Sequence, residues 1–203
     1  MIIEELKKKS YIRYLQIIYF GESSNTSLIL IYLLEMELIK IFNSSDENYL
    51  REIKYQWLIE EFKKNSSEFF LVRNLKKFKN ISEEHLIKYI DSHKRIRINS
   101  EKIIDFNIFD KISKKLNTLI NSSYRVKIFQ SNRIFIYFYY VYSLRQQKLV
   151  NEDLFHKYLN KFENIKFDKL EYTFLKIFKK NFDFNITKLR FLFYFIIKLI
   201  FKK

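Results

Sequence analysis

Tight turns and phosphate-binding loops rely on glycine and proline, and this chain has almost none of either. One glycine, Gly21, and no proline occur in 203 residues. Helices joined by Asn- and Ser-rich connections need neither residue. The apolar residues also recur at intervals of three and four, the spacing of one helix face, rather than at intervals of two. We therefore expect an all-α fold.

The apolar periodicity predicts a helical bundle with short polar breaks between the helices. Hydrophobic residues make up 48% of the chain, which supplies the material for one core at this length. We expect a single domain over residues 1–203. The predicted helices cover residues 1–20, 27–42, 47–64, 67–79, 82–95, 104–120, 128–149, 152–162, 169–180 and 187–202.

The first two predicted helices assign charged side chains to particular faces. Residues 1–20 are expected to form one helix that carries Arg13 on a basic face, together with three lysines. In the next helix Glu35 belongs to the apolar stripe, so we expect its carboxylate on the buried side. Glu37 and Lys40 lie three residues apart on another face of that helix.

The predicted helix over residues 47–64 contains the only tryptophan of the chain. Ser44 and Glu47 have the spacing of a capping box at its start. Trp57 lies on a face with Leu50, and we expect it to anchor the helix in the core.

The net charge of +15 is concentrated in the second half of the chain. Residues 1–100 carry 17 basic and 14 acidic side chains, and residues 101–203 carry 21 and 9. This favours an anionic partner, either nucleic acid or an acidic membrane surface. A coding sequence biased toward A and T, which enriches lysine, gives the same charge without a functional reason. The longest apolar runs are shorter than the roughly 18 residues that span a bilayer. We expect a cytoplasmic protein, with peripheral contact to the inner face of the membrane as an option.

Few residues are arranged for catalysis or metal binding. Without cysteine there is no thiolate site, and His85, His93 and His156 lack zinc-protease spacing, so we expect ordinary surface histidines. Glu101 and Asp105 form an acidic i, i+4 pair whose expected role is to stabilise a helix start. A Ser-His-Asp triad stays open, but no nucleophile elbow supports it. We expect no metal or cofactor.

Two runs near the N-terminus carry a resemblance to a known family: Leu33-Leu-Glu-Met-Glu-Leu-Ile-Lys-Ile41 and Glu52-Ile-Lys-Tyr-Gln-Trp57. They resemble the A-F-N-x-E-L-A-R-V and G-E-I-R-L-Q-W-W-R segments of squalene/phytoene synthase family proteins. The most similar branch includes bacterial relatives of the mitochondrial respiratory complex I assembly factor. Segments at residues 86–95, 137–154 and 170–193 are similar to later parts of the family pattern, in the same order.

The resemblance implies the all-helical isoprenoid-synthase fold, whose active members join two prenyl diphosphates head to head with Mg²⁺. By this alignment the family's first aspartate cluster falls at Ile39, Lys40 and Asn43, none of which is a carboxylate. The second cluster falls just after Arg145, where the chain is shortened. Because Mg²⁺ stabilises the charge that develops as diphosphate leaves, loss of both clusters removes the main electrostatic contribution to catalysis.

We therefore expect a non-catalytic member of this family, acting as a binding or respiratory complex I assembly-type factor with a protein partner or a prenyl-type lipid. The alternative is a Mg²⁺-dependent head-to-head prenyl transferase of isoprenoid biosynthesis. Nucleic-acid binding is a third hypothesis, which only the charge and the aromatic content favour. The residues expected to line a relic pocket are Glu35, Glu37, Lys40, Lys54, Gln56, Trp57 and Arg145.

The C-terminal segment, residues 187–203, combines a bulky apolar run with cationic ends. Such a helix can lie in the headgroup region of an anionic membrane with its lysine and arginine side chains reaching outward. A closing helix of the bundle is the other interpretation. The predicted membrane-contact residues are Arg190, Phe191, Phe193, Phe195 and Lys198.

Overall fold

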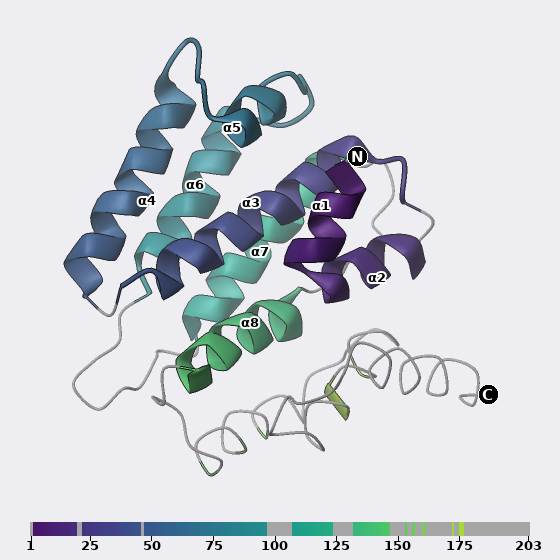
Figure 1. Ribbon diagram of the computed structural model, residues 1–203, viewed down its shortest axis with the longest axis vertical. Coiled ribbons are helices and arrows are strands. Elements are labelled where there is room, and N and C mark those ends of the chain that lie inside the picture. Colours follow the sequence, from purple (N-terminus) through teal and green to yellow (C-terminus); the bar gives the residue numbers. More distant parts are fainter. Residues whose placement is uncertain are drawn as a thin grey trace. The chain divides into compact units, whose positions relative to one another are not determined.

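Every element in the described part of the chain is a helix, and the all-α prediction is confirmed (Figure 1). The structure is a computed structural model. It describes residues 2–19, 22–45, 47–96, 107–123 and 132–146, and the isolated residues 153, 156, 160, 172, 175 and 176. The three helices predicted after residue 149 otherwise lie outside the described residues.

The chain divides into two compact units, Met1–Phe129 and Gln130–Lys203, so the single domain over 1–203 stays a prediction. The first unit contains seven described helices and the second contains one. In chain order they are α1 (Ile2–Lys9), α2 (Tyr11–Tyr19), α3 (Thr26–Asn43), α4 (Asn48–Lys63), α5 (Phe70–Leu75), α6 (Glu83–Lys94), α7 (Asn107–Ser123) and α8 (Arg133–Gln146).

Helix α3 forms the centre of the first unit. It packs against α1, α4, α5 and α7, and 14 of its 18 residues are buried. A helix buried on nearly all sides needs apolar residues around its whole circumference, which is wider than the single stripe predicted for it. Its start is fixed by Asn25, whose side-chain oxygen accepts the backbone N–H of Leu28 at 3.0 Å.

The N-terminal segment forms two helices, α1 and α2, rather than the predicted single helix over residues 1–20. The break falls at Ser10, whose hydroxyl oxygen accepts the backbone N–H of Arg13 at 3.1 Å. Serine in this position is a good N-cap, and it starts a new helix in place of continuing the old one. Helices α1 and α2 pack against each other and run in different directions (Figure 1), and α1 also packs on α3.

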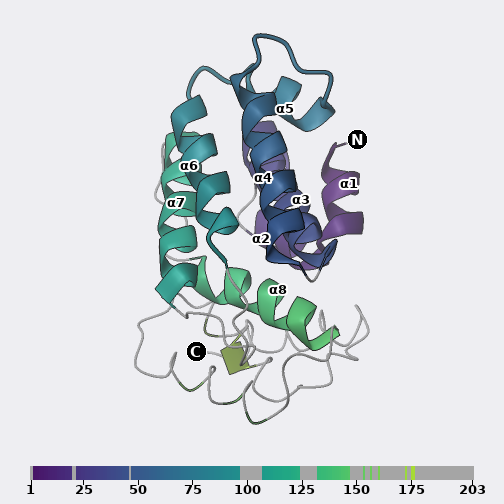
Figure 2. The ribbon, with the colours of Figure 1, turned by 90° about the vertical axis from the view of Figure 1, so that its left-hand side faces the viewer.

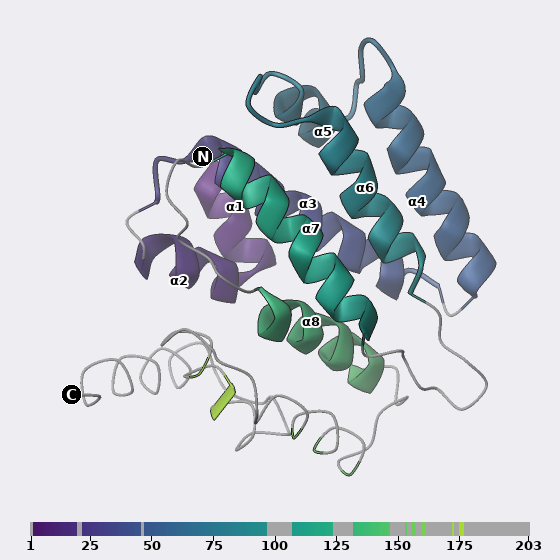
Figure 3. The same ribbon diagram turned by 180° about the vertical axis from the view of Figure 1, so that it is seen from behind.

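Helix α6 lies between α4 and α7, with which it packs on either side (Figure 2, Figure 3). The predicted capping box at the start of α4 does not form. Ser44 instead ends α3, since its hydroxyl donates to the carbonyl of Ile41 at 2.8 Å and its backbone N–H bonds the same oxygen. Glu47 precedes α4 and makes no side-chain capping hydrogen bond.

Helix α5 has six residues, fewer than the predicted helix over 67–79. The hydroxyl of Ser67 donates to the Glu61 carboxylate at 2.5 Å and holds the chain in a turn before the helix. At the far end the ammonium of Lys76 donates to the backbone carbonyl of Phe62 at 2.5 Å. Both contacts tie this connection to the end of α4.

Trp57 is not a core anchor, contrary to the prediction. Its side chain is 46% exposed and lies against the ring of Phe69, with 5.6 Å between ring centroids. The buried face of α4 is formed by Tyr55, Leu58 and Phe62 instead. The sequence pattern was ambiguous because large side chains lie on both sides of α4, including the exposed Leu50 at 42%.

Two truncations on α4 test this orientation. Phe62→Ala removes a side chain with no exposed surface and should lower the free energy of unfolding by about 3–5 kcal/mol. Trp57→Ala should cost about 1 kcal/mol or less, because half of the side chain already contacts water. Urea unfolding of both variants measures the difference. Equal costs would contradict the orientation.

Candidate functional site

A buried ion pair joins α2 to α3 inside the first unit. Arg13 Nε donates to Glu35 Oε2 at 2.7 Å, and Arg13 Nη2 donates to Glu35 Oε1 at 2.6 Å. Neither side chain has any exposed surface. Two parallel charge-assisted hydrogen bonds are the strongest form of an arginine–carboxylate contact. Both oxygens of Glu35 are therefore engaged by one guanidinium.

The guanidinium of Arg13 also contacts a glutamine and an aromatic ring. Its Nη1 donates to the side-chain oxygen of Gln16 at 2.7 Å, and its guanidinium carbon lies 4.5 Å from the centre of the Tyr32 ring. A guanidinium over an aromatic face is attracted by the ring quadrupole. These contacts replace the water that Arg13 gives up on burial.

Two further tyrosines are buried in the first unit. Tyr55 is 2% exposed, and its hydroxyl donates to the backbone carbonyl of Leu38 at 2.9 Å. Tyr89 on α6 has no exposed surface. Burial, and then the nearby negative charge of Glu35, raise the pKa of Tyr89 well above its usual value. Its phenol is therefore neutral at every pH at which the protein is handled.

His93 lies beside Tyr89, with the two rings edge to face and 4.7 Å between their centres. It has no exposed surface, and burial lowers the pKa of its imidazole from 6.5 to about 3. The expectation of an ordinary surface histidine is therefore wrong for His93. The reason is its position on the inner face of α6, four residues after Tyr89.

The sequence predicted one member of this cluster and missed the others. Glu35 lies on the buried side, as its place in the apolar stripe of α3 indicated. Arg13 was assigned to a basic face, and that was wrong because Ser10 starts a new helix with a different orientation. Ser10, a residue type favoured at helix N-caps, is the signal that could have placed the break.

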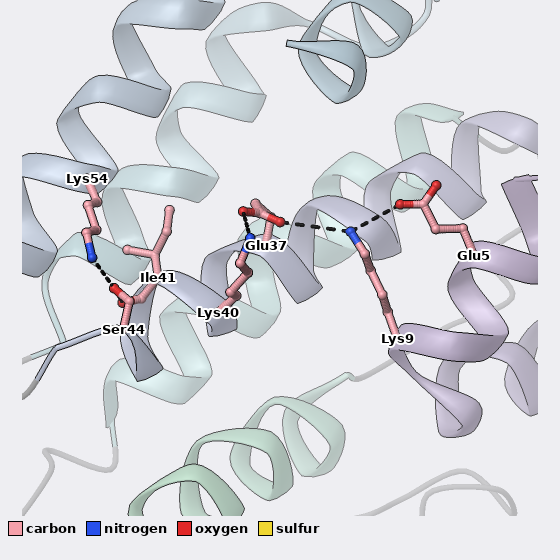
Figure 4. Close-up of polar contacts among 7 residues, drawn as sticks. All are labelled: Glu5, Lys9, Glu37, Lys40, Ile41, Ser44 and Lys54. Atoms are coloured by element: carbon pink, nitrogen blue, oxygen red, sulfur yellow. Dashed lines mark hydrogen bonds and ion pairs between the residues drawn. The ribbon is translucent and has the colours of Figure 1, made fainter.

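Glu37 and Lys40 lie on the outer face of α3, where Figure 4 shows them in a chain of ion pairs. Lys40 Nζ is 3.3 Å from Glu37 Oε1, and Lys9 Nζ is 4.0 Å from Glu37 Oε2. Lys9 also lies 3.1 Å from Glu5 within α1. The predicted i, i+3 contact is present. The Lys40 side chain is 75% exposed, and pairs of this kind contribute only about 0–1 kcal/mol.

The candidates on α4 lie on its surface. Lys54 donates to the Ser44 hydroxyl at 2.7 Å, across the connection between α3 and α4 (Figure 4). Gln56 accepts from Lys94 on α6 at 3.1 Å, and together with Trp57 the two line an open groove of about 420 Å³. The predicted relic-pocket residues of the first unit therefore lie in three places rather than around one pocket.

Several candidates lie in the second unit or outside the described side chains. Arg145 belongs to the last turn of α8, and its side chain is not described. The C-terminal membrane-contact candidates Arg190, Phe191, Phe193, Phe195 and Lys198 lie outside the described residues, as do Glu101 and Asp105.

The alignment assigns the family's first aspartate cluster to three residues of α3 whose side chains do not share one environment. Ile39 is 8% exposed, whereas Lys40 and Asn43 are on the surface. Within the described ranges, no group of three or more His, Asp or Glu side chains could hold a metal ion.

Comparison of the chain with protein-family models, with curated proteins and with solved structures gives no match, so the family resemblance stays a hypothesis. In the part of the chain that the structure describes, no helix has both the length and the apolar character needed to cross a bilayer.

His93 makes the stability of the first unit sensitive to acid. The folded state keeps His93 neutral down to about pH 3, whereas the unfolded state takes up the proton near pH 6.5. The unfolded state binds more protons between these values, so the free energy of unfolding falls as the pH falls through this window. Between pH 7 and pH 5 we expect a loss of about 2 kcal/mol from this group.

The variant His93→Phe keeps a ring of similar size and removes the titration. Urea unfolding at pH 7, 6 and 5 measures the free energy of unfolding of both proteins. Between pH 7 and pH 5 this free energy should fall by about 2 kcal/mol less in the variant than in the natural protein. The comparison uses the slope and not the absolute stability, so a general destabilisation does not obscure it. Parallel slopes for the two proteins would rule out a buried neutral His93.

Proposed function

We propose that this chain is a non-catalytic helical binding protein, of the assembly-factor kind to which the squalene/phytoene synthase resemblance points. The observation that carries the proposal is the bidentate contact between Arg13 and Glu35. It commits the buried carboxylate of Glu35 to a structural contact, with Tyr32 against the guanidinium of Arg13 and the buried Tyr89 close enough for the charge of Glu35 to raise its pKa.

The prenyl-transfer alternative requires a different interior. Mg²⁺ that holds a diphosphate is bound by carboxylate oxygens from facing helices. Glu35 is already bonded at both oxygens, and the guanidinium of Arg13 at 2.6 Å repels a second cation. Lys40, at a position of the aligned first aspartate cluster, adds a positive charge on the outside of α3. These features favour a binding role over catalysis.

The fold proposed with this function is the isoprenoid-synthase type of helical bundle. Its support is the central, nearly fully buried α3 with α4, α6 and α7 packed in succession beside it. Aromatic side chains lie next to the ion pair, with Tyr32 against Arg13 and the buried Tyr89 near Glu35. A protein partner is the class of ligand that this arrangement favours.

Incubation of the full chain with Mg²⁺ and farnesyl or geranylgeranyl diphosphate tests the proposal. We expect no head-to-head product, and no more diphosphate release than from the Glu35→Gln variant. The reason is that Glu35 is bonded to Arg13 and that no carboxylate occupies the aligned aspartate-cluster positions, so the ligands that would hold Mg²⁺ are missing. Circular dichroism checks that each variant is folded. Turnover by the natural protein that is lost in Lys40→Ala, a surface change that leaves the core intact, would overturn the proposal.

A further inference from the structure

A pocket of about 310 Å³ lies between α6 and α7 of the first unit, away from the buried ion pair. Helix α6 contributes Lys88 and Asp91, and Arg95 at its C-cap follows on the same face. Helix α7 contributes Lys111 and Lys115, one turn apart, opposite them. Two packed helices thus direct basic side chains into one space.

The charge of this pocket is strongly positive. Four cations and one carboxylate line it, a net charge of +3. Asp91 accepts a hydrogen bond from Arg95 at 2.7 Å, and Lys88 pairs with Glu84 in the preceding turn of α6. Both pairs are largely exposed, and exposed pairs of this kind open at little cost. Lys88 and Arg95 can therefore turn toward a ligand.

Lys111 and Lys115 have no ion pair within the part of the chain that the structure describes. Like charges at i, i+4 destabilise a helix slightly. Lys115 is at the middle of α7 and Lys111 one turn before it, so both are far from the C-terminal turn where cations stabilise a helix. An anion between them would relieve their repulsion.

We propose that this pocket binds a phosphate group, carried by a small soluble molecule or by a phospholipid headgroup. A phosphate has the charge and the acceptor oxygens to contact several cations at once, with Arg95 in a bidentate geometry and the lysines as point charges. The volume lies at the lower end of the range for small-ligand pockets. The site is separate from Arg13 and Glu35, so it does not depend on the function proposed above.

The experiment uses the full chain with two probes. Inorganic phosphate is titrated by calorimetry at an ionic strength held constant with sodium chloride. Vesicles of phosphatidylcholine, with and without phosphatidic acid, are used in sedimentation. The test variant is Lys111→Gln with Lys115→Gln. The control is Lys63→Gln with Lys79→Gln, which removes the same charge at exposed positions outside the pocket.

We expect the test variant to weaken binding by about tenfold or more, because two charge-assisted contacts are lost, and the control to change it less than twofold. Lys111→Arg with Lys115→Arg should retain binding. Saturation by inorganic phosphate assigns the site to a soluble ligand, and binding only to the phosphatidic acid vesicles assigns it to a headgroup. Binding of neither probe, or equal loss in the test and control variants, would overturn the proposal.

Discussion

The ion pair between Arg13 and Glu35 imposes the strictest condition on the first unit, because two charges without any exposed surface must be matched completely. Removing ions of this size from water costs several kcal/mol each, which only good geometry and further hydrogen bonds recover. Arg13 meets this condition with two bonds to Glu35, one to Gln16 and the ring of Tyr32. Ser10 caps the helix that carries Arg13, so a local capping interaction contributes to placing one member of the pair.

How far the sequence predicted this structure depended on the range of the interactions involved. Helix α3 and the inward position of Glu35 followed from apolar spacing alone, which is a local property. The interior places of Arg13 and His93 did not, since they depend on which helix packs against which. The prediction that Trp57 is a core anchor was wrong for a related reason. Helix α4 carries large side chains on both sides, and only its packing against α3 and α6 decides which of them are buried. The predicted capping box at Ser44 was wrong because this serine lies between the end of α3 and the start of α4, and its hydroxyl bonds the end of α3.

The distribution of charge connects the structure to the proposed functions. In the interior, Arg13 and Glu35 neutralise each other, and the ring of Tyr32 lies against the guanidinium, an arrangement suited to holding α2 and α3 together. On the surface, by contrast, one pocket between α6 and α7 is lined by four cations and one carboxylate, a net charge of +3. The resemblance to squalene/phytoene synthases implies that any chemistry would lie in the interior of the bundle. The contacts of Arg13 and Glu35 favour a structural role for the interior, and the cationic pocket between α6 and α7 favours binding at the surface.

The energetic coupling between Arg13 and Glu35 tests the central claim most directly, through a double-mutant cycle of Arg13→Met, Glu35→Leu and the combined variant in urea unfolding. Each single change leaves an uncompensated buried charge and should cost about 3–5 kcal/mol, whereas the combined change removes both charges and should cost less than either. A coupling of about 2 kcal/mol or more is the predicted result. Additive costs, within about 0.5 kcal/mol, would show that the two residues do not form the buried pair and would contradict the account.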